Sequence, residues 1–129
     1  MIAVDTSALV AIVLGEPEAE VMLSAIREAG SLMSAATLVE TGIVVEARQG
    51  PDATRDLQLL VDAAIEVVPF DGDHARAAIM AWNRFGRGRH PAGLNLGDCF
   101  SYATASLAGV PLLYKGSDFG LTDIPAALR

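Results

Sequence analysis

Short apolar runs alternate along this sequence with longer amphipathic stretches, and this alternation strongly limits the possible folds. The runs have three to five residues, which predicts short buried strands at 2–4, 31–34, 65–69 and 111–114, with a possible edge strand at 122–124. The longer stretches between them predict helices. This order is typical of an α/β protein, and we expect a three-layer α/β/α sandwich around a mostly parallel sheet of four or five strands.

The predicted helices have readable ends. Their starts are expected at Ser7, near Pro17, at about Ala36, after Pro51, at Asp71 or Asp73, and at Asn95. Glycines typical of helix ends follow three of these segments, at Gly30, Gly50 and Gly109. In the second helix we expect Val21, Leu23 and Ile26 to face the core.

At 129 residues the chain has the length of one domain, and we expect residues 1–129 to form a single one. Hydrophobic residues make up 52% of it, enough for a core without disulfide bonds. Cys99 is the only cysteine, which excludes a disulfide-built secreted scaffold and favours a reducing cytoplasm. No apolar run reaches the roughly 20 residues of a membrane span, so we expect no membrane association.

The formal net charge of −7 argues against a protein that coats nucleic acid, because such proteins are basic. Contact with nucleic acid would need a local basic patch, a bound cation or a larger assembly. Residues 84–90 offer a patch, with Arg84, Arg87, Arg89 and His90 and no acid. A helix end that favours cations would explain the same arginines.

Two acidic residues come directly or shortly after predicted strands. Asp5 follows the first strand, and Asp118 follows the run at 111–114. The carboxyl ends of parallel strands share one edge of the sheet, where ligands of such folds bind. Both residues also have a structural explanation, Asp5 as the cap of a turn and Asp118 as a surface turn residue.

Two further acids lie on predicted helices. Asp98 is in the first turn of the last helix, where with Asn95 it could simply form a capping box. Glu40 stands in an otherwise apolar helical face. A lone carboxylate there costs several kcal/mol unless it is paired or binds something, and the alternative to a ligand role is a salt bridge to Arg48 or Arg76.

Together these four acids predict a cation site. Two unit charges 4 Å apart repel by roughly 4 kcal/mol at an effective dielectric constant of 20. A folded domain has only about 5–15 kcal/mol of total stability, so a cluster of carboxylates implies a neutralising ion. Oxygen ligands without cysteine or histidine favour Mg²⁺ or Mn²⁺ over zinc.

The sequence resembles the PIN-domain ribonucleases, and more narrowly the VapC toxins of type II toxin–antitoxin modules. The resemblance covers the whole chain in order. It is carried by IAVDTSAL at 2–9, Glu40, RHPAGLNLGDCFSYA at 89–103 and LLYKGSDF at 112–119. The most specific piece is LNLGDCFSYA, at 94–103.

The resemblance implies a Mg²⁺- or Mn²⁺-dependent RNA endonuclease whose catalytic residues are Asp5, Glu40, Asp98 and Asp118. Asp5, Asp98 and Asp118 would hold the metal, and Glu40 would orient or deprotonate the attacking water. Cleavage would leave 5′-phosphate and 3′-hydroxyl ends. Some PIN domains have a further acid near the position of Asp118, but here Asp123 lies farther on, which puts a fifth ligand in doubt.

The resemblance also implies two partners, a cognate VapB-type antitoxin and a second copy of the chain in a homodimer. Residues 19–26 with Val10 and Val13 are the expected dimer face. Arg87, Arg89 and Lys115 are the expected contacts to the RNA substrate.

Two other functions fit parts of the pattern. A phosphatase could use Asp5 as its nucleophile, although such enzymes usually have a second Asp two residues on, where Ser7 stands. The chain could also be a non-catalytic PIN-like module that binds RNA or protein. Ser7 argues against the phosphatase, and the complete set of four acids argues against the non-catalytic module.

Overall fold

The computed structural model describes residues 1–128. Its sheet has four strands in the order β3-β2-β1-β4, and all neighbouring pairs are parallel. The strands are β1 (Ile2–Val4), β2 (Ser31–Ser34), β3 (Ile65–Val68) and β4 (Leu112–Leu113). All four strands predicted from apolar runs are confirmed, with the last two shorter than expected.

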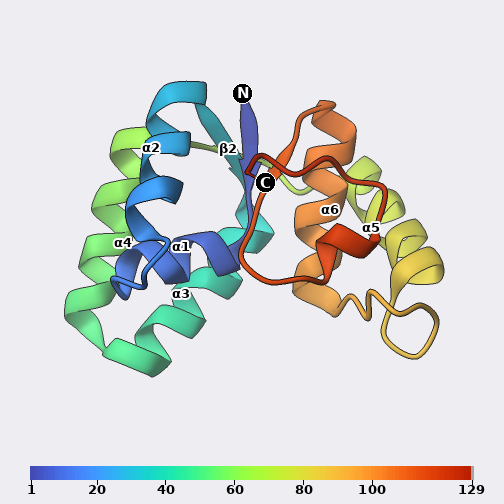
Figure 1. Ribbon diagram of the computed structural model, residues 1–129, viewed down its shortest axis with the longest axis horizontal. Coiled ribbons are helices and arrows are strands. Elements are labelled where there is room, and N and C mark those ends of the chain that lie inside the picture. Colours follow the sequence, from blue (N-terminus) through green and yellow to red (C-terminus); the bar gives the residue numbers. More distant parts are fainter. Residues whose placement is uncertain (129) are drawn as a thin grey trace.

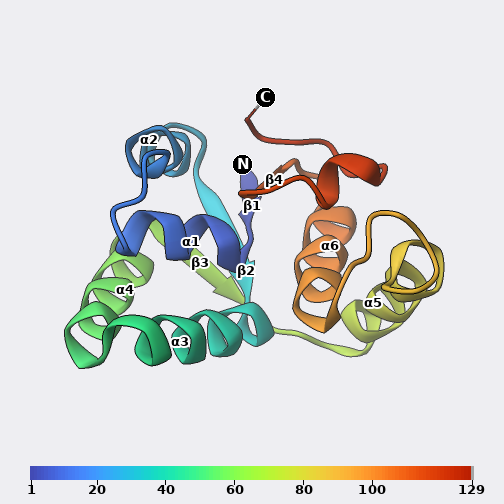
Figure 2. The ribbon, with the colours of Figure 1, turned by 60° about the horizontal axis from the view of Figure 1, so that its bottom comes forward.

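Helices cover both faces of this sheet, so the predicted three-layer α/β architecture is confirmed (Figures 1 and 2). On one face lie α1 (Thr6–Val13), α2 (Ala19–Ala29), α3 (Ala35–Gln49) and α4 (Pro51–Ala64). On the other lie α5 (Gly72–Phe85) and α6 (Leu96–Ala108), followed by a short 3₁₀ helix, η1 (Phe119–Leu121). All six predicted helices are present.

The helix starts follow local capping chemistry. Asn95 caps α6 as predicted, and Asp71, one of the two expected candidates, caps α5. The predicted N-cap of α1 was wrong by two residues. Asp5 rather than Ser7 is its N-cap, because the chain turns into the helix directly from the last residue of β1.

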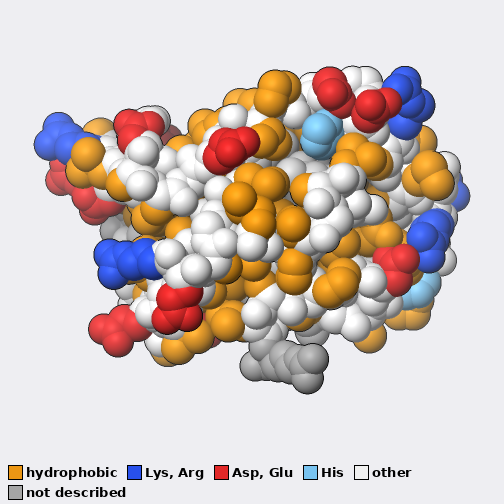
Figure 3. All heavy atoms as spheres, turned by 90° about the horizontal axis from the view of Figure 1, so that it is seen from above, with side chains coloured by type: hydrophobic (Ala, Val, Ile, Leu, Met, Phe, Trp, Pro, Cys, Tyr) orange, Lys and Arg blue, Asp and Glu red, His pale blue; other side chains and the backbone are white. Residues whose placement is uncertain are grey.

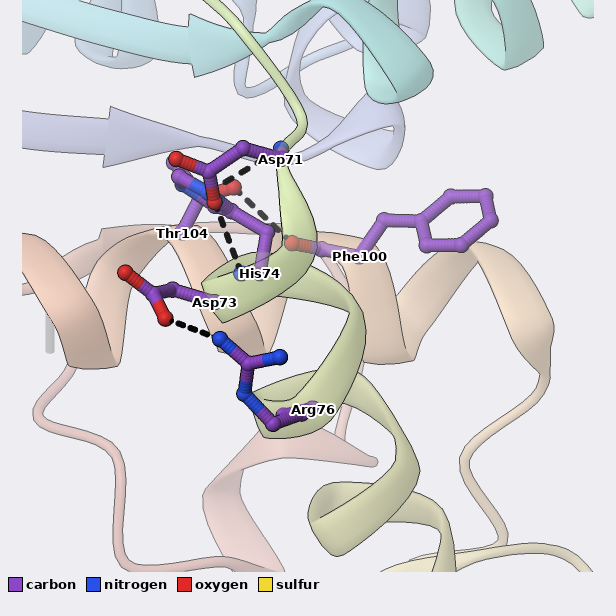
Figure 4. A network of polar contacts seen from close by, with 6 residues as sticks. All are labelled: Asp71, Asp73, His74, Arg76, Phe100 and Thr104. Atoms are coloured by element: carbon purple, nitrogen blue, oxygen red, sulfur yellow. Dashed lines mark hydrogen bonds and ion pairs between the residues drawn. The ribbon is translucent and has the colours of Figure 1, made fainter.

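Polar contacts order the first turn of α5, where Asp71 pairs with His74 and Asp73 pairs with Arg76 (Figure 4). His74 Nδ1 lies 2.8 Å from Asp71 Oδ1, and the His74 ring packs 5.5 Å from Phe70. Beside it, the Thr104 hydroxyl donates to the Phe100 carbonyl of α6 at 3.0 Å. These polar contacts lie within α5 or within α6, and the start of α5 meets α6 through the rings of Phe70 and Phe100, whose centroids are 4.9 Å apart.

The core has two parts, one on each face of the sheet. Met22 and Ile26 of α2 enter the first part, but Val21 is 58% exposed, so the prediction that it faces the core was wrong. Inward positions four residues apart, 22 and 26, form the buried stripe instead. Val10, expected at a dimer face, is buried in the same part of the core.

The C-terminal segment protects the edge of the sheet without forming the strand predicted at 122–124. Leu112 N donates to Pro125 O, and Ala127 N donates to Leu112 O, both at 2.9 Å. Asp123 is instead occupied by the Tyr102 hydroxyl and, at 3.4 Å, by Arg84 Nη1. The free edge of β4 is therefore covered by a short irregular stretch.

Within residues 1–128, no helix is long and apolar enough to cross a membrane. Figure 3 shows the face at the amino ends of the strands, where apolar side chains gather in the middle and charged ones around them. The predicted ligand edge lies on the opposite face, at the carboxyl ends, near the bottom of Figure 1.

Candidate active site

Asp5 is buried at the carboxyl end of β1, with both carboxylate oxygens engaged. Oδ2 accepts hydrogen bonds from the backbone N and the hydroxyl of Ser7, at 3.0 and 2.6 Å. Oδ1 accepts one from the buried hydroxyl of Ser101, on α6. These donors fix the carboxylate between the first helix and the last one, with an exposed fraction of only 3%.

Glu40 lies on α3, with its side chain directed at the same place. Its Oε1 accepts a hydrogen bond of 2.5 Å from Thr6, whose hydroxyl also lies 2.9 Å from that of Thr41. Its other oxygen touches the first turn of α6, where a Cβ on Gly97 would come within 1.7 Å of Oε2. Burial raises the pKa of Glu40, with a further upward contribution from the charge of Asp5.

Asp98, in the first turn of α6, is half of the capping box that the sequence suggests. Its Oδ2 accepts from Asn95 N at 3.0 Å, and its own N donates to Asn95 Oδ1 at 2.8 Å. Burial raises the pKa of Asp98 to about 6, and the charges of Asp5, Asp118 and Glu40 push it the same way. The structural explanation is thus correct, and the residue also faces the other acids.

Asp118 lies at the far end of the loop between β4 and η1 and is exposed. It is the least enclosed of the four acids, but it is close enough to Asp98 to disfavour ionisation there. The loop is attached to the site at its start, where Lys115 N donates to the Ser7 hydroxyl at 2.9 Å. The same hydroxyl donates to Asp5, so one serine connects the loop to the buried carboxylate.

A pocket of about 460 Å³ joins these elements. It is lined by the acids Asp5, Glu16, Glu40 and Asp98, the cations Arg48 and Lys115, and Thr6, Ser7, Val10, Val44, Asn95 and Gly116. A hollow of about 520 Å³ between α2 and residues 127–128 is larger, but it lies away from the four acids. The convergence of carboxylates makes the smaller pocket the candidate active site.

The donor set suits a hard divalent cation in kind, because every acidic ligand offers oxygen. In the described part of the chain, however, no three acidic, histidine or cysteine side chains are close enough together to hold one ion as they stand. Asp98 explains part of this spacing, since its carboxylate is turned back onto Asn95 N. A shared ion would therefore need these side chains to move closer together than they stand here.

The three basic residues expected to contact a substrate do not all lie at the pocket. Lys115 lines the pocket, but its Nζ is paired with Glu16 at 2.5 Å and Glu18 at 3.2 Å. Arg87 and Arg89 are exposed on the loop between α5 and α6, which lies beyond α6 from α1 and α3 in Figure 1. They do not line the pocket.

Sequence reasoning assigned no role in the site to Ser101 and treated Arg48 only as a possible salt-bridge partner of Glu40. No such ion pair forms within residues 1–128. Helical periodicity in the sequence could have indicated that both residues lie near the predicted acids. Arg48 lies eight residues after Glu40, and Ser101 three after Asp98, spacings that return to the same side of a helix.

A parallel sheet with carboxylates gathered at its carboxyl edge defines the class of protein, and the chain belongs to the PIN-domain family, whose model matches residues 2–125. Similar proteins indicate a narrower group within this family. A ribonuclease VapC from Mycolicibacterium smegmatis is 50% identical over 125 residues, covering 95% of this chain and 97% of that protein. Ribonuclease VapC30 from Mycobacterium tuberculosis is 50% identical over 123 residues, covering 94% of each.

Solved structures show the same fold. VapC20 from Mycobacterium tuberculosis, described as a toxin that cleaves the sarcin–ricin loop, superposes with a TM-score of 0.78 at 19% identity, covering 96% of both chains. A toxin–antitoxin complex from Klebsiella pneumoniae has a TM-score of 0.69 at 21% identity, covering 92% of this chain and 90% of that one. At these identities the likeness concerns the fold alone.

Proposed function

We propose that this chain is an endoribonuclease toxin that hydrolyses RNA phosphodiester bonds with the help of Mg²⁺ or Mn²⁺ and is controlled by a cognate antitoxin. The ribonuclease activity of its 50% identical relatives supports the reaction. The observation that carries the proposal is the common pocket of Asp5, Glu40 and Asp98, with Asp118 near enough to raise the pKa of Asp98.

In this proposal Asp5, Asp98 and Asp118 hold the cation. A divalent ion bound there would lower the pKa of a coordinated water and offset charge that develops on the phosphoryl oxygens. Asp5 is already oriented by Ser7 and Ser101. Burial and the neighbouring carboxylates disfavour the ionised form of Asp98, and a cation held there would favour it.

Glu40 receives the proton of the attacking water. Its half-buried position raises its pKa toward the range in which a carboxylate is an effective base, while the Thr6 hydroxyl keeps one oxygen in place. The oxygen of the water bonds to phosphorus, the P–O3′ bond breaks, and the leaving 3′-oxygen takes up a proton from solvent, so the 2′-hydroxyl of the RNA does not attack. The expected products therefore have 5′-phosphate and 3′-hydroxyl ends.

Arg87, Arg89 and Lys115 contact the RNA backbone in this proposal, the two arginines outside the pocket and the lysine at its rim. The Klebsiella pneumoniae relative in fold is a toxin–antitoxin complex, which supports an antitoxin partner for this chain. We also propose a homodimer, in keeping with the family resemblance.

The test is cleavage of labelled structured RNAs by the purified protein with Mg²⁺ or Mn²⁺, beside Asp5→Asn and Asp98→Asn. Asparagine is as good an N-cap as aspartate, so Asp5→Asn removes the charge without removing the cap of α1. We expect each variant to lose about 10²-fold or more in rate, and EDTA to stop the wild type.

Equal cleavage by the wild type and both variants would refute this site. Binding of RNA without any cleavage would favour the non-catalytic module instead.

A further inference from the structure

One face of α3 follows the floor of the pocket for about two turns. Glu40, Val44 and Arg48 are spaced by four residues, and all three line the pocket. Eight residues of helix rise by about 12 Å, so Arg48 stands roughly that far from Glu40 along the axis. Arg48 nevertheless lines the same pocket as the carboxylates, so an anion bound there lies within its reach.

The two cations that line this pocket differ in their availability. Lys115 is paired with both Glu16 and Glu18, and these contacts raise its pKa, which keeps it charged and occupied. Arg48 forms no ion pair with any residue in the range 1–128. Arg48 is therefore the pocket cation that is free to meet an incoming anion.

RNA approaching this site meets mostly negative charge. The pocket contains four acids, and a phosphodiester strand is repelled by them until a cation compensates. A metal at the carboxylates acts on the phosphate being cleaved, but the neighbouring phosphates of the strand need their own partner. A guanidinium is suited to this because it binds a phosphate through two parallel hydrogen bonds.

We propose that Arg48 binds a phosphate flanking the scissile one and thereby sets the position of the RNA strand across the pocket. This inference rests on the proposed function, since it assumes an RNA substrate in this site. Arg48 acts here as a binding residue and takes no part in the bond-breaking step. The strand runs along α3, from the carboxylates at Glu40 toward the end of the helix.

A simpler explanation of Arg48 is available, because a cation in the last turn of a helix is favourable in itself. That role affects only the stability of the protein. A phosphate contact affects RNA affinity and its dependence on salt. Measuring both quantities separates the two explanations.

The experiment measures binding of short, fluorescein-labelled RNAs of random sequence by anisotropy, in an Asp98→Asn background that prevents cleavage. Adding Arg48→Gln should raise Kd about tenfold, as expected for a lost hydrogen bond to a charged group. The slope of log K against log salt should fall by about 0.7, the value for one phosphate contact on a single strand. Arg48→Lys should restore most of the slope but only part of the affinity.

Two further variants sharpen the result. Arg27→Gln removes an equal charge from the last turn of α2, at the opposite edge of the sheet, and should leave both affinity and slope unchanged. Lys115→Gln should weaken binding less than Arg48→Gln, because Glu16 and Glu18 already occupy the lysine.

If Arg48→Gln lowers the melting temperature but leaves Kd and the salt slope unchanged, Arg48 serves only the helix end and the inference is overturned. A parent protein that binds RNA while Arg48→Gln binds it equally well overturns the inference alone. A parent that neither binds nor cuts RNA overturns the proposed function, and the inference with it.

Discussion

Asp98 has two tasks that draw its carboxylate in different directions. As the third residue of α6 it closes the capping box with Asn95, and as a member of the acid cluster it faces three like charges. Burial and these charges together raise its pKa from 3.8 to about 6. Without a cation, ionisation of Asp98 therefore weakens the folded state.

The pH dependence of this effect can be predicted. Below about pH 4 Asp98 is protonated in both states, and its contribution to stability is fully present. As the pH rises through about 6, the unfolded chain has already lost the proton that the folded protein retains, and this contribution is lost. Above pH 7 in EDTA, we expect Asp98→Asn to be more stable than the wild type by about 1–2 kcal/mol, after allowance for partial solvent screening.

Urea unfolding at pH 4.5 and pH 7.5 measures this difference. The two proteins should differ little at the lower pH. A difference that does not change between the two pH values would show that the acid cluster does not perturb Asp98.

At the scale of elements, the site depends on how closely α6 approaches α3. Gly97 allows this approach, because a side chain at that position would overlap the Glu40 carboxylate. The absence of a Cβ at Gly97 is therefore a requirement of packing between helices. It is not a requirement of backbone conformation, since Gly97 lies inside α6.

Gly97→Ala should separate activity from stability. Alanine is a better helix former than glycine by about 1 kcal/mol, so the substitution should cause little net loss of stability if Glu40 moves aside. Displacement of Glu40 should lower the cleavage rate by about tenfold or more, measured with the RNA assay above. The matched control is Gly42→Ala, on α3, where an added Cβ has no neighbour within 4 Å and activity should stay the same.

Full activity of Gly97→Ala would indicate that the contact between Glu40 and α6 is unnecessary. Loss of activity in both alanine variants would point to a general effect of stiffening the helices.

The elements themselves could largely be predicted, because their determinants are local. The apolar runs gave the strands, and capping residues gave the limits of α6 at Asn95 and Gly109. The prediction of a strand at 122–124 was wrong, because the conformation of this segment depends on residues far away in the sequence. Tyr102 and Arg84 both bind Asp123. The inward position of Val21 was wrong because the apolar pattern of α2 fits more than one buried stripe, and only the packing selects among them.

The acids of the candidate site could be predicted from the sequence, but the side chains that hold them could not. Topology places Asp5 and the loop carrying Asp118 at the same edge of the sheet, which strand order alone suggests. The hydroxyl groups that hold the acids, such as Thr6 on Glu40, were not assigned in advance, because hydrogen bonds between distant segments depend on side-chain placement. The same holds for the pairing of Lys115 with Glu16.

At the scale of the whole molecule, negative charge is concentrated at the candidate site. The protein carries a net charge of −7, and five of its acids, Asp5, Glu16, Glu40, Asp98 and Asp118, lie at or beside one pocket. Mutual repulsion there opposes folding, and a divalent cation that binds only the folded state relieves it. Metal binding should therefore be visible as a gain in stability, independently of catalysis.

We expect Mg²⁺ or Mn²⁺ to raise the melting temperature, with a stabilisation of about 2.7 kcal/mol when the ion is present at a hundred times its Kd. Asp98→Asn should shrink this gain. Asp62→Asn, on the exposed side of α4, removes the same charge away from the pocket and should retain it. A melting curve that is indifferent to both ions would contradict a shared metal site.

Ser7 and Lys115 meet at the site although they are 108 residues apart in the chain. During translation, Asp5 leaves the ribosome long before the loop with Asp118 is made, and Glu40 and Asp98 emerge at separate times between them. A growing chain therefore holds only part of the pocket. If these four acids are the catalytic residues proposed above, the nascent protein would be unable to cut RNA until nearly all of the fold has assembled.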